Sequence, residues 1–126
     1  MVAVGIDYGR KRTGIAVFVQ GAVIPSEPVK GGWDSILGRM TELSEMYGEF
    51  TVVIGLPLSA LGKPTELSRE VEELARRIRD TGYAVETVNE VRSSLEAVNL
   101  LGKKDRKGRV DSVAACEILK RYLHII

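Results

Sequence analysis

Hydrophobic and polar positions follow different patterns along the chain, and each pattern predicts a different kind of secondary-structure element. Apolar runs rich in β-branched residues predict three consecutive strands, at about 2–7, 13–19 and 22–29. Gln20 and Gly21 supply a tight turn between the second and third strands. Pro25 and Pro28 lack the backbone N–H that a central strand needs. The third strand is therefore expected at an edge of its sheet, or frayed at its end.

Helical spacing replaces the strand pattern after residue 30. Apolar residues recur every three or four positions over 33–46, which predicts a helix that Gly48 stops. A second helix ends at Gly82, and its apolar stripe consists of Leu67, Val71, Leu74 and Ile78. The last predicted helix, at about 110–123, is apolar on most faces and is therefore expected to be well buried.

Two further strands alternate with these helices. Residues 51–54 form an apolar run typical of a strand buried on both faces, and residues 83–88 alternate as another strand. A loop is predicted at 56–64 and a short helix at about 93–101. The resulting order, β-β-β-α-β-α-β-α-α, predicts an α/β fold with a mixed five-stranded sheet. Three strands are antiparallel, two are connected by crossovers, and helices cover both faces.

The composition narrows the class of protein. A chain of 126 residues that is 44% hydrophobic is expected to form a single domain over 1–126. The sequence contains no membrane-length apolar run and no secretory signal. The single cysteine, Cys116, lies in an apolar helical pattern and is expected to be a core residue. One cysteine and one histidine exclude an internal disulfide and the usual kind of zinc site, and the expected compartment is the cytoplasm.

Positive charge is concentrated although the net charge is only +1. Eight of the 18 basic residues lie in two short tracts, 10–12 and 103–109. The candidate substrate-binding residues are Arg10, Lys11, Arg12, Arg92, Lys103, Lys104, Arg106, Lys107 and Arg109. The second tract has the composition of a loop, and such a charge run can simply be solvated. Its functional interpretation is an arm that contacts phosphates.

Three carboxylates stand apart from the other acids because apolar sequence surrounds them, namely Asp7, Glu90 and Asp111. Most of the 17 acids fall on helix faces that are expected to be solvated, including Glu70, Glu72 and Glu73. Asp7 and Glu90 end predicted strands, where sites in α/β sheets form. Asp111 begins the last helix on its packing stripe. A gathered trio of carboxylates repels itself, and a hard divalent cation such as Mg²⁺ or Mn²⁺ would keep it ionised.

Each of these acids also has a structural interpretation. Asp7 can form the turn that follows its strand. Glu90 can pair with Arg92 or with another surface cation, and Asp111 can act as the N-cap of its helix. The functional interpretation requires that all three lie close enough to act together.

One apparent nucleotide-binding motif fails on its chemistry. The segment 55–65 contains Gly-Lys before a helix, as a phosphate-binding P-loop does. Pro57 stands where that loop needs glycine, and Pro64 stands where it needs Ser or Thr. A structural loop at the rim of the active site is the better interpretation.

Four motifs in order resemble the YqgF family, the Holliday-junction-resolvase-like branch of the RNase H-like superfamily. The matching segments are Gly5-Ile6-Asp7-Tyr8-Gly9 with Arg12 and Gly14-Ile15-Ala16, then Val53-Ile54-Gly55-Leu56-Pro57-Leu58 with Gly62, Asn89-Glu90, and Val110-Asp111-Ser112-Val113-Ala114-Ala115. The resemblance covers essentially the whole chain. It implies an RNase H-like fold and a Mg²⁺- or Mn²⁺-dependent nuclease. The matched catalytic and metal-binding positions are Asp7, Glu90 and Asp111, and Arg12 would contact a phosphate or brace the acids.

The chain departs from this family at one motif. The family usually has Asp-Glu-Arg followed by a hydrophobic residue and two Thr or Ser, whereas this chain reads Asn89-Glu90-Val91-Arg92-Ser93-Ser94. The acid before Glu90 has become an amide, and the arginine sits one place later. Glu90 itself is kept, so metal binding is expected. A shift of one residue changes the direction of Arg92.

The resemblance implies a nuclease that hydrolyses phosphodiester bonds in 5′-end processing of pre-16S ribosomal RNA. One alternative is a Holliday-junction DNA resolvase that uses the same site. An alternative of another class is a non-catalytic nucleic-acid-binding module in ribosome assembly or transcription, which the altered run at 89–92 favours. The expected partner is nucleic acid (structured or single-stranded RNA, or junction DNA) and not a membrane. A monomer or a weak homodimer is expected.

Overall fold

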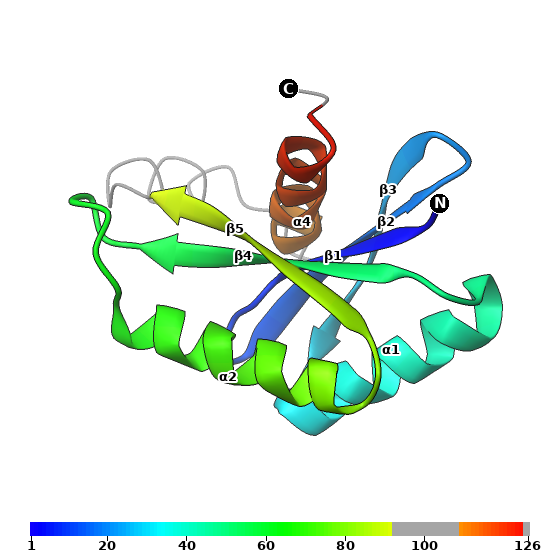
Figure 1. The fold of residues 1–126 in the computed structure, drawn as a ribbon, viewed down its shortest axis with the longest axis horizontal. Helices are drawn as coiled ribbons and strands as arrows, with labels where there is room; N and C mark the ends of the chain where they lie inside the picture. The colour runs from blue at the N-terminus through cyan, green and yellow to red at the C-terminus, as the bar shows by residue number, and fades with distance from the viewer. Residues whose placement is uncertain (92–108, 125–126) are drawn as a thin grey trace.

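The computed structural model describes residues 1–91 and 109–124, and it shows a five-stranded sheet with helices on both sides (Figure 1). The elements are β1 (Ala3–Asp7), β2 (Arg12–Val19), β3 (Ala22–Lys30), α1 (Trp33–Tyr47), β4 (Thr51–Leu58), α2 (Glu66–Asp80), β5 (Ala84–Val91) and α4 (Arg109–Tyr122).

The sheet has the predicted mixture of strand directions. Its strand order is β3-β2-β1-β4-β5. The first three strands are antiparallel, and β4 and β5 join β1 in parallel. The edge position of β3 is confirmed, as its two prolines predicted. The tight turn before β3 is also confirmed, because Gln20 (φ 51°) and Gly21 (φ 80°) both have positive φ, as a type I′ turn requires.

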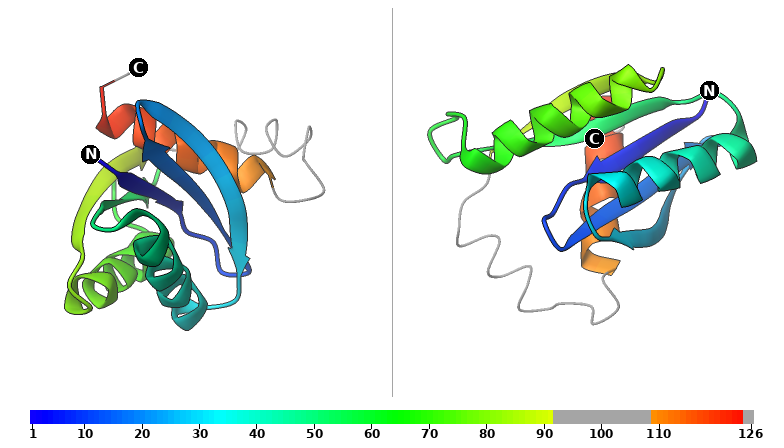
Figure 2. Two further views of the ribbon diagram at one scale, coloured as in Figure 1. Left: turned by 90° about the vertical axis from the view of Figure 1, so that its right-hand side faces the viewer. Right: turned by 90° about the horizontal axis from the view of Figure 1, so that it is seen from below.

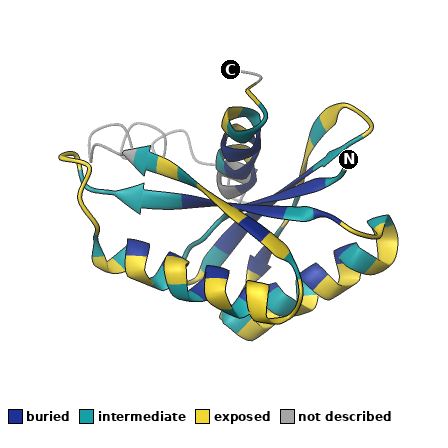
Figure 3. Ribbon diagram, viewed as in Figure 1, coloured by how far each residue is buried: buried dark blue, intermediate teal, exposed yellow. Residues whose placement is uncertain are grey.

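Successive strand residues point to opposite faces of the sheet, which creates two separate cores. On one face, residues such as Val4, Ile6 and Ile54 pack with buried side chains of α1 and α2. On the other face, Ala3 and Val53 pack with α4. Figure 2 shows α1 and α2 on one side of the sheet and α4 on the other, and Figure 3 shows that the outward sides of α1 and α2 are exposed. Helices on both faces are therefore confirmed.

Two glycines let α4 approach the sheet closely. A β-carbon on Gly5 would lie 2.6 Å from Cγ of Leu119 and 2.8 Å from the carbonyl oxygen of Ala115. A β-carbon on Gly55 would lie 2.5 Å from Cδ1 of Ile118. Real Cβ contacts do not reach such distances. At Gly5 the β-carbon would meet the α4 backbone itself, so a side chain there would push α4 outward, whereas at Gly55 the Ile118 side chain would have to shift.

The path of α4 crosses the strands rather than following them. Near its start, the buried Ser112 donates a hydrogen bond of 2.6 Å from its Oγ to the carbonyl oxygen of Ser26 in β3. One turn later the helix lies over β1, and a further turn brings it over β4, at the two glycines just described. The helix therefore runs from β3 toward β5, and its last turn lies near the β5 edge of the sheet.

The fourth strand is longer than predicted. The sequence predicted a strand at 51–54 and a loop at 56–64, but β4 continues to Leu58 and pairs with β5 along its whole length. The predicted end of this strand before the loop at 56–64 is wrong, because β5 pairs with the extension. The pairing of β4 with β1 stops at Ile54. Among the residues that the structure describes, β4 therefore has a strand on one side only at Pro57, and such a position tolerates proline.

The three described helices confirm their predictions, with one exception in burial. Gly48 (φ 77°) and Gly82 (φ 105°) follow α1 and α2 with the left-handed backbone that favours glycine. Burial of α4 is restricted to the side that faces the sheet, because Val113 on the outer side is 55% exposed. The predicted helix at 93–101 lies outside the described residues. Within the described part, no helix has the length and apolar character needed to cross a membrane.

Candidate active site

Asp7 and Glu90 lie at the carboxyl ends of two parallel strands and on the same face of the sheet. Asp7 shares the α4 face with Ala3, two pleats earlier in β1, and Glu90 shares it with Val88, which packs against the α4 core. Only β4 separates the two strands, so their backbones are two strand spacings apart, about 10 Å. Both side chains are partly buried. The arrangement directs two carboxylates toward one region beside α4.

Gly55 forms the floor between these two acids. It sits in β4 on the same face, one pleat before Pro57, the register partner of Glu90. The aliphatic part of Glu90 lies beside Gly55, because its Cγ would be 3.4 Å from a β-carbon built on Gly55, an ordinary contact distance. Ile118 of α4 closes the same space from above. The stem of Glu90 therefore lies beside Gly55 on the α4 face of the sheet.

One oxygen of Glu90 has an unusual environment. The side chain is 13% exposed, and its Oε1 is buried without receiving a hydrogen bond from any part of the chain that the structure describes. The nearest cation among these residues is Arg121 in the last turn of α4, whose Nη1 lies 3.6 Å from Oε1. Buried carboxylate oxygens are costly unless a donor, a cation or a metal compensates them. This oxygen is therefore suited to coordinate a cation.

Asp111, the third predicted acid, directly precedes Ser112 near the start of α4. Asp111 lies in the first turn of the helix, but its side chain is outside what the structure describes. Among the described side chains, no group of three or more His, Cys, Asp or Glu residues could hold a metal ion. The grouping of all three acids thus remains a prediction, and Asp7 and Glu90 are the two whose positions are known.

The turn after Asp7 is fixed by its own hydrogen bonds. Thr13, fully buried in β2, accepts a bond of 3.3 Å from the Gly9 N–H and donates one of 3.2 Å to the Gly9 carbonyl oxygen. Gly9 is required here because a β-carbon would collide with the carbonyl oxygen of Arg12. The turn that carries the first basic tract is consequently held in one conformation.

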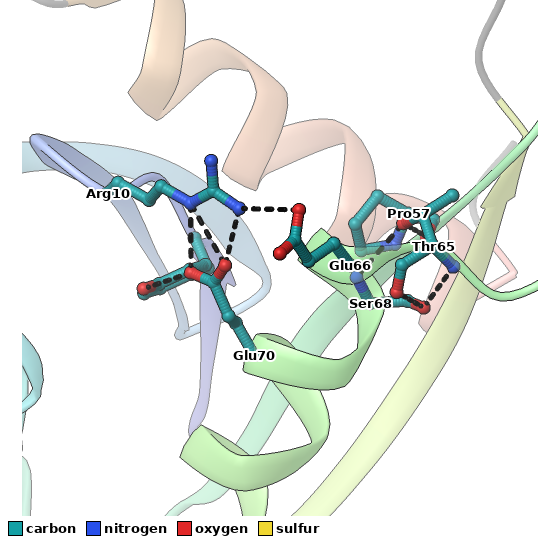
Figure 4. Close-up of polar contacts among 7 residues, drawn as sticks. Arg10, Pro57, Thr65, Glu66, Ser68 and Glu70 are labelled. Carbon is teal, nitrogen blue, oxygen red and sulfur yellow. Dashed lines mark hydrogen bonds and ion pairs between the residues drawn. The ribbon is translucent and has the colours of Figure 1, made fainter.

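Glu70 of α2 anchors this turn from the opposite face of the sheet (Figure 4). Its Oε2 accepts hydrogen bonds from Arg10 Nε (2.9 Å) and Nη2 (2.5 Å), and its Oε1 accepts one from the Tyr8 hydroxyl (3.0 Å). Arg10 Nη2 also lies 4.0 Å from Glu66 Oε2. The hydrogen bonds from Arg10 lower the pKa of Glu70, whereas burial, followed by the bond to Glu70, raises the pKa of Tyr8.

Glu70 is partly exposed on the polar side of α2, as predicted, but its carboxylate has partners. Helical periodicity correctly puts it on the polar side of α2, but the turn beyond β1 reaches that side and supplies two donors. Glu73 also has partners, because its carboxylate pairs with Arg76 and Arg77 of the same helix. Glu72 is exposed, as predicted.

The remaining candidate substrate contacts are distributed unevenly. Lys11 is exposed in the turn, and Arg12 is partly buried at the start of β2. Arg109 begins α4, but its side chain is not described. Arg92, which follows β5, lies outside the described residues. The same holds for four basic residues of the second tract, namely Lys103, Lys104, Arg106 and Lys107.

Two residues near the candidate site were not predicted. Glu70 could be found only by knowing that α2 passes beside the turn after β1. Arg121 follows a lysine in the last turn of its helix, where a basic residue ordinarily complements the helix dipole. Its proximity to Glu90 depends on the diagonal path of α4 across the sheet, which no local sequence signal reveals.

Comparisons with known proteins agree with this architecture. A family model described as "RuvX: Holliday junction resolvase" matches residues 1–125. Curated relatives named "Putative pre-16S rRNA nuclease" come from Chlorobium chlorochromatii and Oleidesulfovibrio alaskensis. Both are 35% identical, covering 95% and 99% of this chain and 92% and 93% of the relatives. A relative of the same name from Chlorobaculum tepidum is 30% identical over 95% of this chain and 91% of its own length.

Solved structures of RuvC from Thermus thermophilus share the fold. The structure of that protein in complex with a Holliday junction substrate aligns with a TM-score of 0.61 and 16% identity, covering 99% of this chain and 94% of that one. A second RuvC structure gives a TM-score of 0.58 at 18% identity, covering 99% and 95%. The RNase H-like fold is thereby confirmed. The family and the names of the relatives indicate a nuclease, a hydrolase that acts on phosphodiester bonds. The chain belongs to the RuvX family, the family that its motifs predicted under the name YqgF.

Proposed function

We propose that this protein is a divalent-metal-dependent nuclease that processes the 5′ end of pre-16S ribosomal RNA. The observation that carries the proposal is the buried Oε1 of Glu90, which receives no hydrogen bond from the described residues and lies on the same sheet face as Asp7. The names of the curated relatives support the ribosomal RNA precursor as substrate.

The proposed metal ligands are Asp7, Glu90 and Asp111. Their donor atoms are carboxylate oxygens, which favour a hard ion, and Mg²⁺ is the proposed cofactor with Mn²⁺ as a substitute. A bound ion would supply a more acidic water and neutralise charge on the phosphodiester. Glu90 is suited to this role because burial and packing against Gly55 restrict its carboxylate before any ligand binds.

The protein's own cations would hold the nucleic acid beside the acids. Lys11 is exposed, and Arg10 keeps its guanidinium at the surface, where it is paired with Glu70 on the α2 side of the sheet. Both belong to the turn that directly follows Asp7. The proposed contacts also include Arg12 and the basic residues at 92 and 103–109. Such contacts recognise backbone charge and shape rather than base sequence.

Junction DNA is the second candidate substrate. The family description names a Holliday junction resolvase, and the RuvC structure with a TM-score of 0.61 is a complex with a Holliday junction. A resolvase that acts on two strands in concert would be dimeric, whereas an RNA-processing enzyme would function as a monomer or a weak homodimer. The proposal places the protein in the cytoplasm, where a ribosomal RNA precursor is found.

Cleavage of two matched labelled substrates tests the proposal. A ribosomal RNA precursor fragment and a four-way DNA junction are incubated with wild type and Asp7→Asn, with Mg²⁺ or Mn²⁺ and with chelator. The matched control is Asp80→Asn, an exposed acid at the far end of α2 whose described partner is Arg76.

The expected result is metal-dependent cutting of the RNA by wild type and by Asp80→Asn, and loss of cutting in Asp7→Asn. Preferential cutting of the junction would favour the resolvase. Binding of nucleic acid without cutting of either substrate would favour the non-catalytic module that the altered run at 89–92 raises.

A further inference from the structure

Arg121 and Glu90 lie close together although one belongs to a helix and the other to the sheet that this helix covers. Arg121 lies in the last turn of α4, and Glu90 lies near the end of β5 in the sheet beneath it. The diagonal path of α4 from β3 toward β5 brings Arg121 Nη1 within 3.6 Å of Glu90 Oε1. The contact therefore depends on the close approach of α4 at Gly5 and Gly55.

The distance shows what kind of contact this is. At 3.6 Å the two atoms are beyond hydrogen-bond range, so Arg121 supplies positive charge without directing a proton at Oε1. The lone pairs of Oε1 consequently stay available to a closer ligand. Arg121 is the cation that the described residues provide for this buried oxygen.

The two partners differ in how easily they can move. Glu90 is 13% exposed, and the aliphatic part of its side chain lies beside Gly55. Arg121 is 52% exposed and can turn toward solvent, where its guanidinium is well hydrated. A cation that approached Oε1 more closely would displace Arg121 rather than Glu90.

We propose that Arg121 is the counter-ion of Glu90 in the metal-free protein and competes with the divalent ion for this carboxylate. This inference rests on the proposed metal-dependent function. Without metal, the arginine compensates the buried oxygen. A divalent ion that binds Glu90 repels the positive charge of Arg121. The affinity for metal is therefore reduced, because binding breaks the Arg121–Glu90 ion pair and replaces it with this repulsion.

The test measures Mn²⁺ affinity by titration calorimetry in wild type, Arg121→Gln and Lys120→Gln. Lys120→Gln is a matched control because this substitution removes one positive charge at the neighbouring position. The described partner of Lys120 is Glu117, with 3.9 Å between Nζ and Oε1. Arg121→Gln should bind Mn²⁺ about two- to fivefold more tightly, the range expected for a partly exposed ion pair. Lys120→Gln should bind as wild type does, and Arg121→Lys should fall between wild type and Arg121→Gln.

Thermal unfolding in chelator measures the same contact without metal. The melting temperatures of Arg121→Gln, Glu90→Gln and the double variant should be non-additive, because each single change breaks the same pair. Additive effects would show that the two side chains are not coupled and would overturn the proposal.

The outcomes separate this inference from the proposed function. If wild type binds Mn²⁺ and Glu90→Gln does not, the metal site holds. An unchanged or weaker affinity in Arg121→Gln then overturns the role of Arg121 alone. If wild type binds no Mn²⁺, the metal site and the competition fail together, even where the unfolding cycle shows coupling.

Discussion

Gly5 in β1 lies directly beneath Leu119 of α4, so that a β-carbon at position 5 would come within 2.6 Å of the leucine Cγ. This contact sets the height of α4 above the sheet, and α4 carries both Asp111 and Arg121. The fold and the candidate site therefore depend on the same close approach.

Gly5→Ala should destabilise the protein by about 1–3 kcal/mol, because the added methyl group overpacks a tightly packed interface and displaces α4. Urea unfolding measures the change. Gly38→Ala is the matched control, since Gly38 lies in α1 with open space around its missing side chain. That variant should be more stable than wild type by about 0.5–1 kcal/mol, owing to the helix preference of alanine. Equal effects at the two positions would contradict this description of the α4 interface.

The Glu70 anchor predicts a pH dependence of stability. Hydrogen bonds from Arg10 lower the pKa of Glu70 in the folded state below its unfolded value of about 4.3. A lowered pKa contributes stability that is fully present above the unfolded value and is lost as the pH falls through the folded value. The difference in unfolding free energy between wild type and Glu70→Gln should therefore be constant from neutral pH to about pH 5 and should shrink below it.

Urea unfolding at a series of pH values measures this difference, and Glu72→Gln serves as the control because Glu72 is exposed on the same helix. A wild-type advantage that grows as the pH falls would contradict the assignment of Glu70 as the partner of Arg10.

Lys11 predicts the salt dependence of nucleic-acid binding. It is exposed in the turn after Asp7, where it would contact a phosphate. Lys11→Ala should weaken RNA binding similarly for unrelated sequences and should reduce the slope of log K against log salt by about one. Fluorescence anisotropy at several salt concentrations measures the slope. Arg76→Ala, which removes a charge from the outer side of α2, should leave it unchanged, and a reduced slope in that variant would argue against a localised site.

Local sequence patterns predicted most of the fold because each one reports a local requirement. The prolines of β3 and the Gln20-Gly21 turn determined the edge strand and its hairpin without any tertiary information. The extension of β4 to Leu58 could not be predicted in this way. It depends on support from β5, which follows α2 in sequence and lies beside β4 only in the folded chain.

In the candidate site, too, local sequence patterns did not predict contacts between elements that are distant in the sequence. The motifs selected Asp7 and Glu90, and the strand register places them on one face with a single strand between them. The partners of the charged residues were not predictable. By periodicity, Glu70 and Arg121 lie on ordinary helix surfaces. Glu70 contacts Arg10 because α2 passes the end of β1. Arg121 contacts Glu90 because α4 passes the end of β5.

The most direct test of the central claim compares two glutamates of β5. Glu90 and Glu86 occupy the same face of the strand, two pleats apart, but Glu86 is exposed and Glu90 is partly buried beside α4. The measurement is the single-turnover rate at which Glu90→Gln and Glu86→Gln cleave a ribosomal RNA precursor at saturating Mg²⁺. Loss of a metal ligand should lower the rate about 100-fold or more in Glu90→Gln, while Glu86→Gln should cleave as wild type does. Cleavage by Glu90→Gln at the wild-type rate would contradict an active site built on this carboxylate.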